Sequence, residues 1–142
     1  MVEALTLART HHERLSEVRS LIGLAIVEHL AGEADTCVRN FTEAIEAWRE
    51  LADMVGEAYT RRHLGMHLLR RGKAAEAEKE IQTARRLLRE HGAKTESPFL
   101  LRSLAEIYLA RGDLVSAAEC AEQAVTALSG EDDVPYATHR VT

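Results

Sequence analysis

Apolar residues recur along this chain at the spacing of helix faces, and the pattern breaks at regular intervals. Leu15, Val18 and Ile22 fall three or four positions apart, which places them on one side of a helix. The pattern stops at glycines, which suit helix ends because the residue past the last turn often needs positive φ. Ser97 and Asp113 have side chains that can cap the helices after them. The pattern predicts helices over residues 2–11, 14–31, 34–52, 55–71, 74–91, 98–111 and 114–129.

The same pattern repeats every forty residues. Three glycines keep this spacing, at Gly32, Gly72 and Gly112, and three leucines keep it as well, at 24, 64 and 104. A period in this range is typical of proteins built from stacked units, and each unit here reads as two helices. We therefore expect an all-α fold, a right-handed superhelical array of antiparallel helix pairs.

The repeat predicts how the chain is divided. We expect a single domain over 1–142, with units at 14–52, 55–91 and 98–129. Residues 1–12 align with the second helix of a preceding unit and read as a half repeat that ends near His11 and His12. Residues 134–142 read as the start of a further unit or a tail. The chain then begins and ends inside a unit, as a segment of a longer array or as capping termini.

Composition and the first residues argue against a membrane or secreted protein. Apolar residues make up 46% of the 142 residues and aromatic residues only 4%. No apolar run approaches the roughly 20 residues of a membrane span, and the first residues lack the features of a signal peptide. We expect a cytoplasmic protein with no membrane contact.

Charge is unevenly distributed along the chain. The net charge is −5, but residues 61–94 hold ten Lys/Arg and four Asp/Glu, which makes that stretch +6. Two interpretations remain open: a solvated helix face, or a basic stripe for an acidic partner.

Few residues suggest chemistry. His63 and His67 lie four apart on one helix, a spacing that can hold a metal, but no third ligand is evident, so exposed helix histidines and no metal are expected. Cys37 stands where other units have alanine, which favours a small buried thiol. Cys120 has no histidine near it in sequence. With no phosphate loop and no nucleophile elbow, we expect no enzyme and no cofactor.

The residues that recur in the three units follow a recognisable order along each unit. The third unit shows it most fully: Leu101, Leu104, Ala105, Tyr108, Gly112, Ala117, Ala121 and Ala124. This order resembles the tetratricopeptide repeat. The period of forty exceeds the usual length of about 34, and Arg61 and Glu28 stand where aromatic residues are expected. Such long versions resemble the sensor and interaction segments of large bacterial regulators.

The resemblance implies a function and a surface. It implies a protein–protein interaction scaffold in which the first helices of the units line a concave groove for a peptide or partner helix. His29 lies on the same side of its helix as the groove residues of the first unit. The implied groove residues are Arg19, Ile22, Ile26, Tyr59, Arg62, Met66, Arg70, Phe99, Arg102 and Glu106.

Those side chains combine apolar area with arginines, so the expected partner is a protein or peptide segment with apolar and acidic residues. The alternative is an effector-sensing segment of a transcriptional regulator that binds a small ligand. Nucleic-acid binding is disfavoured by the acidic net charge and the few aromatic residues. Self-association through the ends of the array is also expected, because Leu5, Leu7 and Ala8 of the first half repeat form an apolar helix face whose preceding partner is missing.

Overall fold

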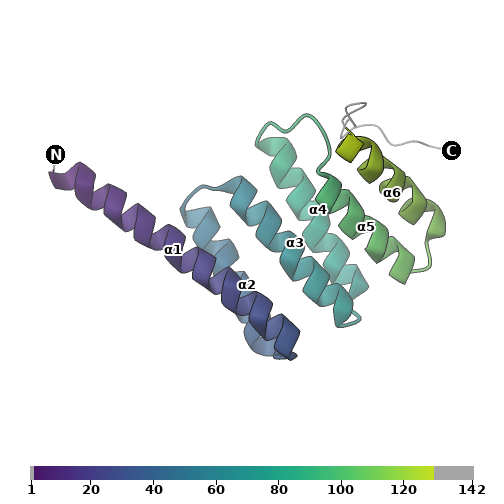
Figure 1. Ribbon diagram of the computed structural model, residues 1–142, viewed down its shortest axis with the longest axis horizontal. Coiled ribbons are helices and arrows are strands. Elements are labelled where there is room, and N and C mark those ends of the chain that lie inside the picture. Colours follow the sequence, from purple (N-terminus) through teal and green to yellow (C-terminus); the bar gives the residue numbers. More distant parts are fainter. Residues whose placement is uncertain (1, 130–142) are drawn as a thin grey trace.

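The structure, a computed structural model, describes residues 2–129, and this part of the chain contains six helices and no strand (Figure 1). The prediction of an all-α fold is confirmed. None of the helices combines the length and the apolar character that a membrane crossing requires. The helices are α1 (Val2–Ala31), α2 (Ala34–Glu50), α3 (Met54–Arg70), α4 (Ala74–Glu90), α5 (Pro98–Ala110) and α6 (Leu114–Ser129).

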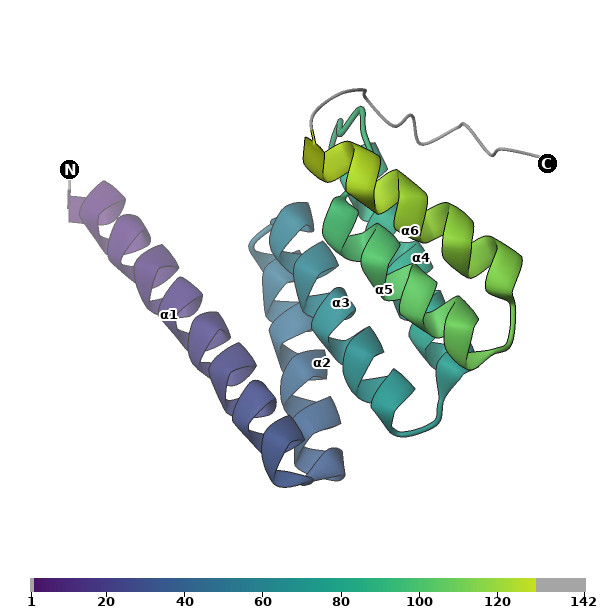
Figure 2. The ribbon, with the colours of Figure 1, turned by 45° about the vertical axis from the view of Figure 1, so that its right-hand side comes forward.

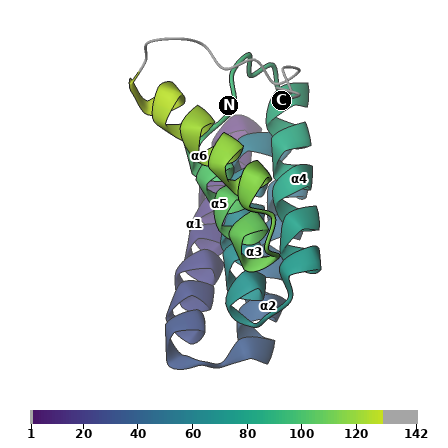
Figure 3. The same cartoon turned by 90° about the vertical axis from the view of Figure 1, so that its right-hand side faces the viewer.

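The helices form an array in two layers. Each helix packs against the next one in sequence, and in addition α1 contacts α3 and α3 contacts α5. Within the described part, α2 and α4 do not contact each other. Figure 1 shows α2 and α4 behind α1, α3 and α5, and in Figure 3 they lie on the right. The first helices of the pairs therefore approach one another along one side of the array, which is the geometry of an inner surface.

The first helix differs from its prediction. The helices expected at 2–11 and 14–31 are one continuous helix, α1, so the break predicted at His11 and His12 is wrong. No glycine or proline interrupts residues 2–22, and the hydroxyl of Thr10 donates to the carbonyl oxygen of Thr6 within the same helix. With 30 residues, α1 is about 45 Å long. Its N-terminal part extends beyond α2 (Figure 2). Residues 134–142 lie outside the described part.

The remaining helices begin and end within two residues of their predicted positions. The breaks predicted at Gly32, Gly72 and Gly112 are confirmed, with φ of 80°, 79° and 80°. The turn between α2 and α3 has no glycine, and there Ala52 adopts a φ of 54°.

The core lies between the layers. Phe41, Ile81 and Leu104 are at most 1% exposed. A Cβ atom added at Gly65 would lie 3.0 Å from Cδ1 of Ile81, so the missing side chain lets α3 and α4 cross closely. Ala84 on α4 is fully buried in the same core. Small residues thus lie beside large ones where α3 and α4 cross, which allows dense packing.

A second apolar cluster joins α1 to α2 and meets α3. It is formed by Val18, Ala44, Ala47 and Trp48. Trp48 is buried, and its Nε1 donates to the Thr60 hydroxyl at 2.9 Å. Gly56 faces the indole so closely that an added Cβ would lie 2.6 Å from the ring. Trp48 is therefore a packing residue at the junction of the first two pairs.

Candidate functional site

The inner side of the array contains a cavity that several predicted groove residues line. It has a volume of about 280 Å³ and lies between α1, α2 and α3. Four residues of the predicted groove reach it: Ile26, Arg62, Met66 and Arg70. The other lining residues are His29, Phe41, His63 and His67. The structure thus brings together the central part of the predicted groove.

Beside this cavity, polar contacts join α3 to α5 and its N-terminal cap. Arg62 donates from Nε to the Ser103 hydroxyl at 3.0 Å, and its guanidinium carbon lies 5.8 Å from the centre of the Phe99 ring. The hydroxyls of Tyr59 and Ser97 share a hydrogen bond of 3.3 Å. Tyr59, Arg62 and Phe99 therefore lie close together, and the guanidinium of Arg62 is already used in the contact between α3 and α5.

The exposed charges beside this contact belong to other residues. Arg70 and Arg102 are exposed, and neither makes an ion pair within residues 2–129. Burial lowers the pKa of Arg62, and the positive charge of Arg102 lowers it further, whereas Glu106 acts in the opposite direction. The side chains of Arg102 and Glu106 hence lie near Arg62, and the exposed positive charge beside the cavity comes from Arg70 and Arg102.

The two predicted groove residues nearest the start of α1 lie outside this cavity. Ile22 packs partly buried against both apolar clusters, so most of its side chain serves the core. Arg19 is exposed, and the structure shows no contact that joins it to the groove residues of α3.

The basic stretch at 61–94 is partly neutralised inside the protein. Arg61 is mostly buried and pairs with Glu57 at 2.9 Å and with Glu80 at 2.7 Å. Arg85 donates twice to Glu96, at 3.0 and 2.6 Å, and the Glu96 side chain is only 1% exposed. These contacts explain why Arg61 can replace an aromatic residue, and they remove two arginines from any basic stripe.

A cluster that the sequence did not predict lies beside the cavity. His29 of α1, Cys37 of α2 and His67 of α3 each offer a ligand atom, and these atoms all lie within 4.8 Å of one another. The Nδ1 atoms of His29 and His67 are 2.6 Å apart. His67 is only 3% exposed, so the prediction of exposed helix histidines is wrong for it. His63 is partly buried, and its ring stacks on Phe41 at 6.1 Å.

The surroundings of this cluster affect its protonation. Burial lowers the pKa of His67, and the nearby charges of His29, Arg71 and Lys73 lower it further, which favours a neutral imidazole. Burial raises the pKa of the Cys37 thiol, confirming the buried thiol expected there, and the negative charge of Glu28 adds to this.

His29 and His67 meet because α1 packs against α3. The spacing of residues along a single helix therefore could not predict this pair. The forty-residue register was the one available signal, because it predicts that α1 and α3 are neighbours. That signal places helices beside each other but does not say which of their side chains meet.

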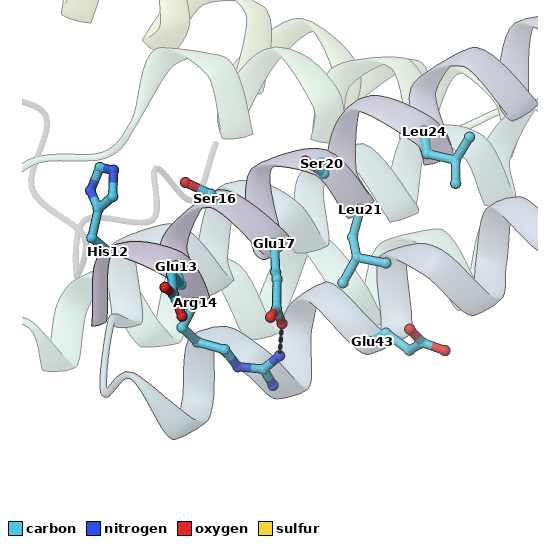
Figure 4. Close-up of a pocket in the computed structure, with 9 residues that line it drawn as sticks. All are labelled: His12, Glu13, Arg14, Ser16, Glu17, Ser20, Leu21, Leu24 and Glu43. Atoms are coloured by element: carbon cyan, nitrogen blue, oxygen red, sulfur yellow. Dashed lines mark hydrogen bonds and ion pairs between the residues drawn. The ribbon is translucent and has the colours of Figure 1, made fainter. Parts of the chain in front are cut away.

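Two further cavities lie away from the groove. The larger, about 710 Å³, is open to solvent and runs along α1 to Glu43 of α2 (Figure 4). Its Arg14 is engaged by Glu17 at 2.7 Å and by Glu50 at 2.8 Å. The smaller, about 160 Å³, lies beside Cys120, whose pKa is raised by burial.

Comparison with known proteins agrees with this architecture. A family model described as Tetratricopeptide repeat matches residues 55–129, more than half of the chain. The solved TPR domain of Arabidopsis FLU is similar, with a TM-score of 0.74 and 21% identity over 83% of this chain and 99% of that one. BtubC (BKLC) from P. vanneervenii is similar, with a TM-score of 0.67 and 18% identity. That match covers 88% of this chain, which spans about half, 53%, of BtubC.

No curated protein sequence matches this chain. At these identities the two structures support the fold alone, and the family model supports the assignment by sequence. The order of leucine, small residue, glycine and alanine in three units and the paired helices agree with both. The chain belongs to the tetratricopeptide repeat family.

Proposed function

We propose that this chain is a protein–protein interaction scaffold that binds a peptide or partner helix along α1, α3 and α5, as part of a larger regulatory protein. Tetratricopeptide repeats generally serve as interaction modules without catalytic activity, and family membership supports that role here. The main support for binding along these helices is the cavity of about 280 Å³ on the inner side of the array. Side chains from both α1 and α3 line it.

The chemistry of the groove indicates the partner. Ile26 and Met66 line the cavity, and Phe99 remains 48% exposed beside it. These side chains offer apolar area to a ligand. Arg70 and Arg102 are exposed on the same side, and a guanidinium can donate two parallel hydrogen bonds to a carboxylate. A segment with both apolar and acidic residues fits this surface.

The test is binding of peptides chosen from a random displayed library. Peptides that bind should carry apolar and acidic residues together. Arg70→Glu with Arg102→Glu should weaken binding on the order of tenfold or more, because each change puts a like charge beside an acidic ligand. Arg62 is left intact because it donates to Ser103, and its loss would disturb the α3–α5 contact.

The matched control reverses two charges on α2 and α4, the helices of the layer behind α1, α3 and α5. Arg39 on α2 and Lys79 on α4 are exposed and make no ion pair in the described part. Arg39→Glu with Lys79→Glu should leave peptide binding unchanged. Circular dichroism establishes that both double variants are folded. Undiminished binding by a folded Arg70→Glu, Arg102→Glu variant would place the contact outside the groove.

The alternative role, sensing of a small effector, would use the same cavity. Its volume of about 280 Å³ lies close to the lower limit of small-molecule sites, which is roughly 300 Å³. A small carboxylic acid that raises the melting temperature of the protein, but not that of the Arg70→Glu, Arg102→Glu variant, would favour this role.

A further inference from the structure

We propose that His29, Cys37 and His67 form a binding site for one transition-metal ion of the Zn²⁺ class. The three residues come from three different helices and meet beside the cavity on the inner side of the array. Two imidazoles and a thiolate are ligands that Zn²⁺ prefers, and three protein ligands with one open position are a known coordination pattern for it. The site borders the cavity of the proposed groove, but its three ligands come from this chain alone, so metal binding needs no bound peptide.

The distances suit such an ion. Bond lengths of about 2.05 Å to nitrogen and 2.3 Å to sulfur place tetrahedral ligand atoms roughly 3.3 to 3.6 Å apart. The three candidate ligand atoms lie within 4.8 Å of one another. The Nδ1 atoms of His29 and His67, at 2.6 Å, need to separate by less than about 1 Å. Side-chain rotations must also bring the farthest pair of ligand atoms up to about 1.2 Å closer together.

The two imidazoles of the cluster have an incomplete set of hydrogen bonds. His29 and His67 share one bond between their Nδ1 atoms, and Nε2 of His67 is buried with no partner among the described residues. If His67 accepts in that bond, its Nε2 carries an unpaired proton; if it donates, Nε2 is an unpaired acceptor. Buried polar atoms in folded proteins nearly always have partners. Coordination through both Nδ1 atoms would replace the bond that they share and fix the remaining proton of His67 on Nε2.

Charge in the site also balances. Glu28 is buried near Cys37, and its carboxylate accepts a hydrogen bond from the Asn40 amide at 2.5 Å. A divalent cation, the Cys37 thiolate and the Glu28 carboxylate sum to zero net charge. The thiol proton leaves to solvent when the metal binds. Arg71 and Lys73 lie nearby but are exposed, so water screens their repulsion.

The fourth ligand would come from the cavity. His29 and His67 both line it, so an ion held between them faces its interior. A water molecule has room there, and this position remains open to exchange.

The test is titration of the untagged, chelator-treated chain with Co²⁺, which replaces Zn²⁺ at such sites. One equivalent should produce the near-ultraviolet sulfur-to-cobalt charge-transfer band, and Zn²⁺ should abolish the band by displacing cobalt. Cys37→Ala should lose the band and bind cobalt at least roughly tenfold more weakly. This variant should fold, because alanine occupies the equivalent positions Ala77 and Ala117. Cys120→Ala, which changes the other thiol, should keep the band.

Two outcomes would overturn the site. One is cobalt binding without the charge-transfer band, which would indicate exposed imidazoles such as His11 and His12. The other is a band that survives in Cys37→Ala. If that variant does not fold, alkylation of the wild-type protein tests the site. Zn²⁺ should slow alkylation of Cys37 but not of Cys120. Equal slowing of both thiols, or no slowing, would contradict the proposal.

Discussion

At the scale of single residues, Ala52 is the clearest case of backbone strain. It adopts a φ of 54° in the turn between α2 and α3. A side chain in the left-handed region costs roughly 1–2 kcal/mol, and glycine avoids that cost. We expect Ala52→Gly to raise the free energy of unfolding by about 0.5–1 kcal/mol, after the extra chain entropy of glycine is subtracted. Urea denaturation followed by circular dichroism measures the change.

Two variants calibrate this expectation. Gly72 has a φ of 79°, and a Cβ added there meets no atom within 4 Å, so Gly72→Ala isolates the backbone effect and should destabilise the protein by about 1 kcal/mol. Ala118 is exposed within α6, and Ala118→Gly should also cost about 1 kcal/mol. An Ala52→Gly variant that loses as much stability as Ala118→Gly would show that Ala52 is not strained.

Residue environments were predictable only where the repeat register determines them. Cys37 aligns with alanines at helix crossings, and it is buried as that alignment predicts. The sequence predicts an exposed His67 and a departure from the repeat at Arg61, and the structure buries most of both side chains. Their partners, His29 and Glu80, lie on other helices. Polar contacts between helices depend on side-chain directions that helical periodicity does not contain.

At the scale of helices, the crossing at Ala84 allows a direct test of packing. Ala84 is fully buried on α4 within the main core. Ala84→Leu adds three carbon atoms where the side chains already fill the space. We expect it to lower the free energy of unfolding by about 1–3 kcal/mol. The denaturation midpoint in urea, compared with that of the wild type, measures the loss.

The control for this variant lies on the same helix. Lys79 is exposed and makes no ion pair in the described part, so Lys79→Leu should leave the midpoint nearly unchanged. Glu78 is less suitable, because it accepts a hydrogen bond from Arg111 at 3.1 Å. Equal midpoints for Ala84→Leu and Lys79→Leu would contradict the tight crossing.

Helix boundaries were predictable because local signals define them. The side chains of Asp53, Ser97 and Asp113 accept hydrogen bonds from backbone N–H groups at the starts of α3, α5 and α6. The one false boundary, near His11 and His12, came from extending the forty-residue period to the first residues. No residue there disfavours a helix, so α1 continues through it.

At the scale of the whole molecule, the ends of the array explain an exception to the repeat. Leu64 and Leu104 are 6% and 1% exposed on α3 and α5, which pack against α2 and α4. Leu24 holds the same position on α1 but is 52% exposed. Among residues 2–129, no second helix of a preceding pair covers it. Val27, one turn further on, is 61% exposed.

The opposite end carries a complementary surface. On α6, Val125 and Leu128 are 67% and 69% exposed. This helix is the second of its pair, the type of helix that covers the first helix of the next pair elsewhere in the array. The α6 surface of one copy can therefore pack on the Leu24 and Val27 surface of another. Such a head-to-tail contact adds one copy after another until its rotation closes a ring, or without limit when the rotation does not close.

We therefore expect the average mass measured by light scattering to rise with protein concentration. Leu24→Glu with Val27→Glu should abolish the rise, and Leu128→Glu should do the same from the other end of the array. If only the α1 variant acts, two α1 helices pair with each other and the assembly stops at a dimer. Leu7 belongs to the surface that the sequence suggested for self-association, but in the continuous helix α1 it lies on the opposite side from Val27. Leu7→Glu is therefore the matched control. A wild-type protein that stays monomeric at high concentration would refute assembly through either end.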